Sequence, residues 1–180
     1  MLAQEASAQL GLERVLLVPV GEAPHRRIDP EPGADVRLEL TRAAAAADER
    51  LEASDLEIRR GGPSFTYRTL ELLREEDGDR GLWFLMGADV AAQLEDWREP
   101  ARVCELARLG IAVRPGTALD EAQAALGRLG ARGRAETIGM PEIGVSSTEI
   151  RQRVAAGRPI RYLVPDGVAG LIEAEGLYSS

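Results

Sequence analysis

The sequence predicts an α/β protein built on a parallel sheet with flanking helices. Short apolar runs, of the length typical of buried strands, alternate with longer stretches of helical periodicity along the 180 residues. Loops carrying Gly, Pro and charged residues follow several of these runs, and no internal repeat interrupts the alternation. We therefore expect one domain over residues 1–180, with residues 145–180 as its C-terminal helical part.

Five segments are expected to form strands. The strongly apolar ones are RVLLVPV (14–20), GLWFLMG (81–87) and RLGIAVR (108–114). DLEIRR (55–60) is weaker and half-exposed, and AETIGM (135–140) is the least regular.

Helical patterns fill the intervals between these strands. They cover DVRLELTRAAAAA, SFTYRTLELLREE, EPARVCELA and LDEAQAALGRLG. The last 35 residues predict two more helices, the second beginning near Pro165 and Asp166 and closed by Gly176.

A further helix is expected at the start of the sequence, in MLAQEASAQLGLERV. Leu2, Ala3, Ala6 and Leu10 form an apolar stripe ahead of the first strand. A βαβ unit has a strand before such a helix, and the printed sequence holds none at that point.

Charge and composition limit the ligands that the protein could bind. The formal net charge is −8, which argues against nucleic acid and anionic membrane as partners, because both favour a basic surface. All 22 basic residues are arginine, so any phosphate contact from a basic side chain other than histidine uses a guanidinium. The sequence gives no indication of the oligomeric state.

The single cysteine and single histidine exclude several kinds of site. Cys104 has no partner within the chain, which favours a reducing compartment, and its apolar helical context favours a core role over a nucleophilic one. His25 and Cys104 together cannot build a zinc site of the usual type. With no signal peptide and no apolar run near ~18 residues, we expect a cytoplasmic protein without a bound metal of its own.

The segment GVSSTEIRQRV (144–154) is the strongest candidate for a phosphate site. Ser146 and Glu149 have the spacing of a capping box, and such matches most often only cap a helix. Arg151, however, follows Thr148 by three residues and Ser147 by four, so it shares their helix face. Amides, hydroxyls and a guanidinium then meet at a helix N-terminus, where the dipole favours an anion.

Three other loops carry residues that could complete the site. His25 and Arg26 follow the first strand and could clamp a phosphate, although singly such residues more often belong to a solvated turn. Thr66 lies where GGPSFTYRTL starts a helix, which offers open amides to a carboxylate or a sugar hydroxyl unless it is only a capped helix. Ligands in open α/β sheets lie at the carboxyl ends of the strands, so we expect these loops to gather there.

The segment GADVAAQLEDWREP (87–100) follows the next strong strand. Asp89 either binds a ribose hydroxyl or is the N-cap of a helix. Trp97, flanked by Asp96 and Arg98, either stacks on an aromatic ring of a ligand or covers the edge of the core.

Taken together, these motifs resemble those of bacterial nicotinate-nucleotide adenylyltransferases. PHR, GPSFT, GAD…W, RPG, SSTEIR and a final GLY occur in the order of that family over nearly the whole chain. SSTEIR alone marks the wider nucleotidyltransferase superfamily, whereas GPSFT with GAD…W narrows the resemblance to the nicotinate-nucleotide branch. The resemblance implies a Rossmann-like fold and transfer of AMP from ATP to nicotinate mononucleotide, giving deamido-NAD and pyrophosphate.

The resemblance also implies a role for each matching residue. Ser146, Ser147, Thr148 and Arg151 would hold the ATP phosphates, with His25 and Arg26 near them. Asp89 would contact ribose, Trp97 would stack on the nicotinate ring, and Arg114 would help to hold the mononucleotide phosphate. Amides around Thr66, and those after Trp97 at Arg98, would receive the nicotinate carboxylate. Mg²⁺ would arrive with ATP.

The printed sequence departs from the family at its start. The family's first, central strand and its Gly-Gly-Thr-Phe-x-Pro-x-His-x-Gly-His loop have no counterpart, and Phe65 stands where tyrosine is frequent. We expect either that about twenty residues precede Met1 in the native enzyme or that the chain is a truncated product. Without the two histidines of that loop the chain is expected to be almost inactive and poorly soluble.

Two alternatives remain open at the level of sequence. The acceptor could be another one, such as nicotinamide mononucleotide or, less in keeping with Trp97 and GPSFT, phosphopantetheine. The chain could also be a nucleotide-binding remnant without catalysis.

Overall fold

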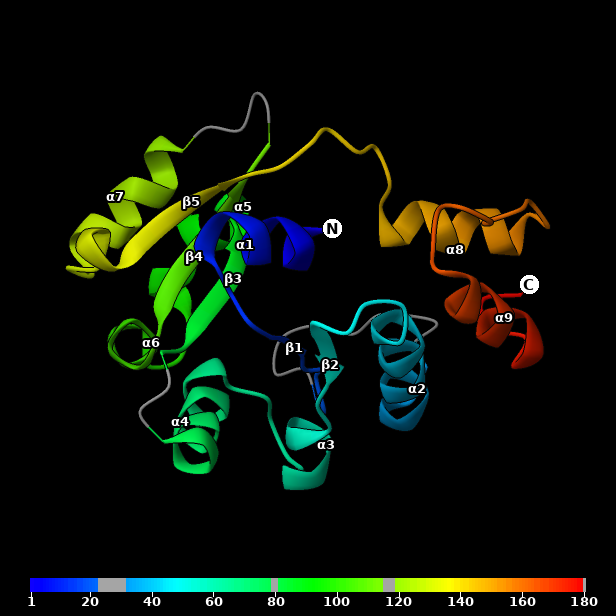
Figure 1. Cartoon of the computed structure of the whole chain (residues 1–180), viewed down its shortest axis with the longest axis horizontal. Coiled ribbons are helices and arrows are strands. Elements are labelled where there is room, and N and C mark those ends of the chain that lie inside the picture. Colours follow the sequence, from blue (N-terminus) through cyan, green and yellow to red (C-terminus); the bar gives the residue numbers. More distant parts are fainter. Residues whose placement is uncertain (23–31, 79–80, 115–118, 180) are drawn as a thin grey trace. The chain divides into compact units, whose positions relative to one another are not determined.

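The computed structural model describes residues 1–22, 32–78, 81–114 and 119–179. The chain divides into two compact units, residues 1–13 with 65–142 and residues 14–64 with 143–180. Figure 1 labels the helices and strands of both units. The predicted extent of a single domain over residues 1–180 stays a prediction.

The first unit is built on a three-stranded parallel sheet. Its strands are β3 (Trp83–Gly87), β4 (Arg108–Val113) and β5 (Ala135–Gly139), in the order β3-β4-β5. Gly87 lies opposite Ala112 and Val113 opposite Gly139, so the three strands end at the same edge of the sheet. These are three of the strands that the apolar runs predict.

Helices cover this sheet and bury its side chains. They are α1 (Leu2–Leu10), α4 (Thr66–Asp77), α5 (Ala88–Ala92), α6 (Pro100–Leu106) and α7 (Asp120–Arg128). Helix α1 packs on β3 and β5, while α5 packs on β3, β4 and α7 (Figure 1). Leu109 and Ile111 of the central strand are at most 2% exposed, as expected for a strand covered on both faces.

The second unit contains a two-stranded parallel sheet and a group of helices. Strands β1 (Val15–Leu17) and β2 (Leu51–Ala53) pair with Val15 opposite Leu51. The helices in the described part of this unit are α2 (Ala34–Ala45), α3 (Leu56–Arg60), α8 (Ser147–Ala155) and α9 (Asp166–Ala174). A small core forms around Ile150, Ile160 and Ile172, and α2 packs against α9.

Strand pairing within the described residues is limited to these two sheets. There, β1 pairs with β2 alone and β3 with β4 alone. The expected additional strand stays a prediction.

The predicted strand at residues 55–60 is wrong. The strand of this region is β2, which ends at Ala53, and residues 56–60 form the short helix α3. Ser54 and Asp55 explain the change, because both side chains favour a helix start. The Leu56 amide donates to Ser54 Oγ over 3.3 Å, and Asp55 accepts from Arg59 Nε over 2.7 Å one turn later.

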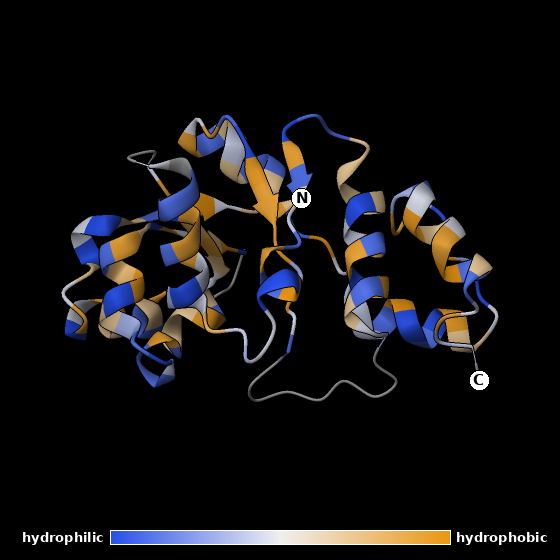
Figure 2. Ribbon diagram, turned by 90° about the horizontal axis from the view of Figure 1, so that it is seen from below, coloured by the Kyte–Doolittle hydropathy of each residue, from blue (hydrophilic) through white to orange (hydrophobic). Residues whose placement is uncertain are grey.

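Hydropathy follows the helical periodicity that the sequence predicts. In Figure 2, hydrophobic and hydrophilic residues alternate around the ribbon of each longer helix. Throughout the described ranges, no helix is both long and apolar enough to cross a bilayer.

Candidate functional site

The N-terminus of α8 is a capped helix start that leaves further donors open. Ser146 is the N-cap, and its Oγ accepts the backbone N–H of Glu149 over 3.1 Å. The predicted capping interaction of Ser146 is thus confirmed. Ser147 and Thr148 are exposed, and among the described residues no partner is recorded for their backbone N–H groups. These groups point outward along the positive end of the helix dipole.

Arg151 lies beside these hydroxyl residues, as its spacing predicts. Its Nη2 donates to Thr148 Oγ1 over 3.4 Å, a long contact that places the two side chains on one helix face. The Arg151 side chain is half-buried. The segment therefore brings two hydroxyls, open amides and one guanidinium together within a single helical turn, which is a suitable arrangement for a phosphate.

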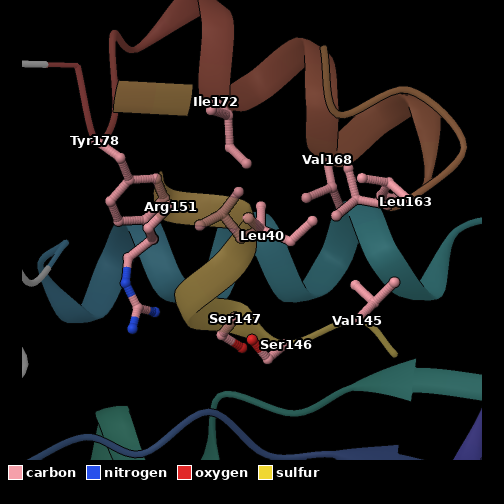
Figure 3. A pocket seen from close by; sticks show the side chains of 11 residues that line it. Leu40, Val145, Ser146, Ser147, Arg151, Leu163, Val168, Ile172 and Tyr178 are labelled. Carbon is pink, nitrogen blue, oxygen red and sulfur yellow. The ribbon is translucent and has the colours of Figure 1, made fainter. Parts of the chain in front are cut away.

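A cavity of about 340 Å³ adjoins the start of α8. Its wall is mainly apolar and comes from α2, α8, α9 and the connection between the last two, while Ser146, Ser147 and Arg151 form its polar rim. Figure 3 shows the guanidinium of Arg151 pointing away from the apolar side chains Leu40 and Ile172. The charged end of Arg151 is thus free to face an anion while its stem packs on the cavity wall.

The loop after β1 is held to the segment that leads into α4. The Gly21 amide donates to Ser64 Oγ over 3.0 Å, and the Ser64 amide donates to the carbonyl oxygen of Glu22 over 2.9 Å. Gly21 and Glu22 therefore lie next to Pro63 and Ser64. His25 and Arg26 themselves lie outside the described residues, so their predicted roles stay predictions.

Helix α4 begins without a side-chain cap. Its N-cap is Phe65, an extended residue with no capping hydrogen bond, and Thr66 is half-buried at the first helical position. Nothing in the described structure caps the first turn of α4 through a side chain. This is the geometry that the hypothesis of open amides around Thr66 requires.

Asp89 lies at the carboxyl end of β3 but is not a helix cap. The N-cap of α5 is Gly87, and Asp89 is the second residue of that helix, which removes the capping interpretation of Asp89. Its carboxylate folds back over Gly87, since a β-carbon at position 87 would lie 2.4 Å from Asp89 Oδ1. The exposed Asp89 carboxylate thus lies directly over the end of the strand.

Trp97 both covers the core and remains partly exposed. Its ring meets Phe84 of β3 edge-to-face, with 5.8 Å between the ring centroids, and it packs against the core of the first unit. Arg98, which follows it, is exposed, as is Arg114 directly after β4. Because β3 and β4 end side by side, the structure places Asp89 and Arg114 after neighbouring strand ends. The ligand roles of these residues stay predictions.

Neither Cys104 nor a carboxylate cluster adds a further reactive centre to the described residues. Cys104 is 5% exposed in the core, which confirms the expected core role, and burial raises the pKa of its thiol. Across the described ranges, no group of three His, Cys, Asp or Glu side chains is arranged to hold a metal ion.

Comparison with known proteins identifies the family. Residues 1–153 match the model of the cytidylyltransferase-like family. A probable nicotinate-nucleotide adenylyltransferase of Roseiflexus sp. (strain RS-1) is 42% identical over 177 residues, which span 98% of this chain and 88% of the relative. This chain belongs to the nicotinate-nucleotide adenylyltransferase family.

A second relative and two solved structures agree with that assignment. A probable nicotinate-nucleotide adenylyltransferase of Thermus thermophilus is 39% identical over 99% of this chain and 90% of its own length. The nicotinic acid mononucleotide adenylyltransferase of Plasmodium falciparum has the same fold, with TM-scores of 0.74 in its complex with APC and 0.75 in its complex with NaAD. The alignment covers 99% of this chain and 88% of the APC complex, and 98% of this chain and 87% of the NaAD complex. Both solved chains are 16% identical to this one, so they support the fold of this chain.

Sequence reasoning missed two tertiary contacts of the turn that follows β1. Ser64 accepts a hydrogen bond from Gly21 instead of capping α4, a tertiary contact that local spacing does not reveal. Arg37 donates to the carbonyl oxygens of Val20 and Gly21 over 2.7 and 2.8 Å. Its only signal in the sequence is an arginine in the first turn of a helix, where the dipole disfavours a cation.

Proposed function

We propose that this protein transfers the adenylyl group of ATP to nicotinate mononucleotide, forming deamido-NAD and pyrophosphate. Relatives about 40% identical over nearly the whole chain carry the name of this activity. The Plasmodium falciparum enzyme with the same fold is named for the same acceptor and was solved with NaAD. Within this chain, the observation that carries the proposal is the start of α8, where Arg151 lies beside Thr148 and open amides.

The chemistry that this site has to support is an in-line displacement at phosphorus. A phosphate oxygen of the mononucleotide forms a bond to the α-phosphorus of ATP while the bond from that phosphorus to the bridging oxygen breaks. Pyrophosphate carries away the electron pair of the broken bond. No covalent enzyme intermediate forms, so the protein contributes by positioning the reactants and stabilising charge.

The α8 segment is suited to the triphosphate of ATP. The amides of Ser147 and Thr148 offer donors at the positive end of a helix dipole, and Arg151 adds a guanidinium that stays charged at all relevant pH values. Mg²⁺ is proposed to arrive with ATP and to be held by its phosphates. His25 and Arg26 are proposed to lie near the same phosphates.

The residues after β3 and β4 are suited to the mononucleotide. Asp89 presents its carboxylate at a strand end, where it could accept hydrogen bonds from ribose hydroxyls. Trp97 has a partly exposed ring that could stack on nicotinate, and Arg114 could pair with the acceptor phosphate. Thr66 and Arg98 are assigned to the nicotinate carboxylate, through uncapped amides at and near them. A cytoplasmic location belongs to the same proposal.

The proposal is tested by measuring pyrophosphate release from MgATP with nicotinate mononucleotide and, separately, with nicotinamide mononucleotide. This assay and the kinetic tests below use the chain with the family's first strand and histidine loop supplied ahead of residue 1. For that protein we expect turnover when both substrates are present and a clear preference for nicotinate mononucleotide. A preference for the amide would overturn the proposed acceptor. Tight ATP binding with no turnover of either mononucleotide would instead support a nucleotide-binding remnant.

The role of α8 is tested in the same assay with Arg151→Gln. Loss of a charged hydrogen-bond donor to phosphate is expected to lower kcat/KM for ATP by about 10- to 100-fold. Arg158→Gln, an exposed arginine beyond the end of α8, is the matched control and should stay within twofold of the wild type. Equal effects of the two substitutions would remove Arg151 from the site.

A further inference from the structure

Arg37 joins two points of the chain that are eleven or more residues apart in sequence. From the first turn of α2 its guanidinium donates to the carbonyl oxygens of Val20 over 2.7 Å and Gly21 over 2.8 Å. A third hydrogen bond, of 2.8 Å, runs to the carbonyl oxygen of Pro32. The planar guanidinium of Arg37 thus ties residues 20–21, which follow β1, to Pro32, which precedes α2.

The position of Arg37 in α2 is unfavourable for the helix itself. Arg37 is the fourth residue of α2, where the positive end of the helix dipole repels a cation. Three charge-assisted hydrogen bonds to carbonyl oxygens outweigh that repulsion. Arg37 is half-buried, lies against the dipole and still donates three hydrogen bonds to backbone carbonyl oxygens, two of them at residues 20–21. These bonds fix the backbone conformation of residues 20–21.

The turn at Gly21 is fixed from a second side as well. Its amide donates to Ser64 Oγ over 3.0 Å. Glu22 forms a β-bridge with Pro63, and its carbonyl oxygen accepts from the Ser64 amide. Gly21 also has no room for a side chain, because a β-carbon there would lie 2.8 Å from the carbonyl oxygen of Glu57. The turn is therefore held between α2, α3 and the GPSFT motif.

This turn lies where a ligand of a parallel α/β sheet is expected. Gly21 follows β1 at its carboxyl end, and ligands of open α/β sheets lie outside the carboxyl ends of the strands. In the sequence, His25 and Arg26 stand between Gly21 and Pro32. Arg37 binds the carbonyl oxygens of both Gly21 and Pro32.

We propose that Arg37 is a positioning residue of adenylyl transfer, which fixes the backbone at the carboxyl end of β1 by binding Val20, Gly21 and Pro32. The inference rests on the proposed function. Arg37 acts through the backbone that it holds and touches no reacting atom, so its loss should lower kcat more than it raises KM. Misplacement of groups near a reacting phosphate by about 1 Å costs on the order of 10²-fold in rate.

The test compares Arg37→Gln and Arg37→Lys with Arg42→Gln as a matched control. Arg42 lies on the same helix, is exposed and pairs only with the Glu39 side chain among the contacts recorded for it. Steady-state kinetics, thermal unfolding and amide hydrogen exchange at Gly21 and Ser64 are measured on each protein. For Arg37→Gln we expect a folded protein with kcat reduced at least tenfold, both KM values within about threefold, and faster exchange at both amides.

The lysine variant and chemical rescue separate positioning from folding. Lysine keeps the charge but cannot fork to three carbonyl oxygens, so Arg37→Lys should lose most of the same rate. Guanidinium ions should partly restore kcat of Arg37→Ala, whereas sodium chloride at equal ionic strength should not. If Arg37→Gln does not fold, the lysine variant and the rescue still decide the question.

Three results would overturn the inference. They are an unchanged kcat in folded Arg37→Gln, unchanged exchange at Gly21 and Ser64, or a rate loss that matches the unfolded fraction. An active wild type with an unaffected Arg37→Gln removes only the role of Arg37. A wild type that turns over no mononucleotide removes the proposed function itself, which is a different result.

Discussion

Gln9 and Gly139 exchange two hydrogen bonds across 130 residues of sequence. The Gln9 Nε2 donates to the Gly139 carbonyl oxygen over 2.9 Å, and the Gly139 amide donates to Gln9 Oε1 over 2.9 Å. Strand β5 uses the neighbouring residue for its ladder, since the Met140 amide donates to the carbonyl oxygen of Val113. The carboxamide of Gln9 therefore satisfies the backbone groups of Gly139 that point away from β4, much as another strand would.

Gln9→Ala should destabilise the first unit by about 1–2 kcal/mol, because two partly exposed hydrogen bonds to β5 are lost. Denaturant unfolding measures the change. Gln123→Ala is the control, since the described structure records no hydrogen bond of the side chain of this exposed α7 glutamine. The change should shift the free energy of unfolding by less than about 0.5 kcal/mol. Equal stabilities of the two variants would show that the carboxamide bridge contributes nothing.

Gln9→Glu gives the same bridge a pH dependence. At neutral pH the carboxylate cannot donate to the Gly139 carbonyl oxygen, whereas the protonated acid can. The folded-state pKa of the introduced carboxyl is therefore raised above its ordinary value of about 4.3. Its stabilising contribution is present below that value and lost as pH rises through the folded pKa. Unfolding free energies at pH 4 and pH 7 should differ more for Gln9→Glu than for the wild type.

Gly110 lets α1 approach the centre of the sheet. A β-carbon at this position would lie 2.6 Å from Leu85 Cδ2, 2.9 Å from Ile138 Cδ1 and 3.3 Å from Leu10 Cδ1. Gly110→Ala should therefore cost about 1–3 kcal/mol by overpacking, against the usual small gain of a glycine-to-alanine change.

The control for Gly110→Ala is Gly133→Ala, where the space around the added β-carbon is open and the backbone conformation is ordinary. It should change stability by less than about 0.5 kcal/mol. Leu85→Ala should also cost less in the Gly110→Ala background than in the wild type, because the two changes share one contact. Additive effects would contradict the close packing.

The strands that the sequence predicts and the one that it mispredicts both depend on interactions between near neighbours in the chain. Strands β3 and β4 are predicted because each is a short, strongly apolar run, and in β4 Leu109 and Ile111 are buried. Strand β5 is more exposed and has the weaker pattern. Residues 55–60 were mispredicted because Leu56 and Ile58 imitate the alternation of a strand, while Ser54 and Asp55 set a helix start. Local side-chain hydrogen bonds decided that segment against its apolar pattern.

In the candidate site, too, local spacing predicts some residues and misses others. Ser146 and Arg151 are found by spacing, since capping and one-face contacts depend on neighbours within four residues. Ser64 and Arg37 were not found, because their partners lie 43 and up to 17 residues away. Contacts of that kind come only from the tertiary fold.

Substitutions at Gly87 and Asp89 should change the kinetics while leaving stability nearly unchanged. Gly87 has an ordinary backbone conformation, and the close contact of a β-carbon would be with the carboxylate end of Asp89, which can move away. Gly87→Ala should thus change stability by less than about 1 kcal/mol while displacing that carboxylate. We expect KM for the mononucleotide to rise by about tenfold, as it should in Asp89→Asn. Wild-type kinetics in both variants would exclude Asp89 from the acceptor site.

Ser146 and Ser147 are neighbours whose substitution should have opposite signatures. Ser146 Oγ accepts the Glu149 amide, so Ser146→Ala removes a cap and should cost about 1 kcal/mol of stability. No side-chain capping bond is recorded for the exposed Ser147 in the described structure, so Ser147→Ala should leave the free energy of unfolding within about 0.5 kcal/mol.

Ser147→Ala, which should not change stability, is expected to lower the activity with ATP. If the Ser147 hydroxyl donates to ATP phosphate, Ser147→Ala lowers kcat/KM for ATP by about 5- to 50-fold in a fully stable protein. Unfolding curves and steady-state kinetics on both variants measure the two effects. A Ser147→Ala protein as stable and as active as the wild type would exclude the Ser147 hydroxyl from the proposed ATP site.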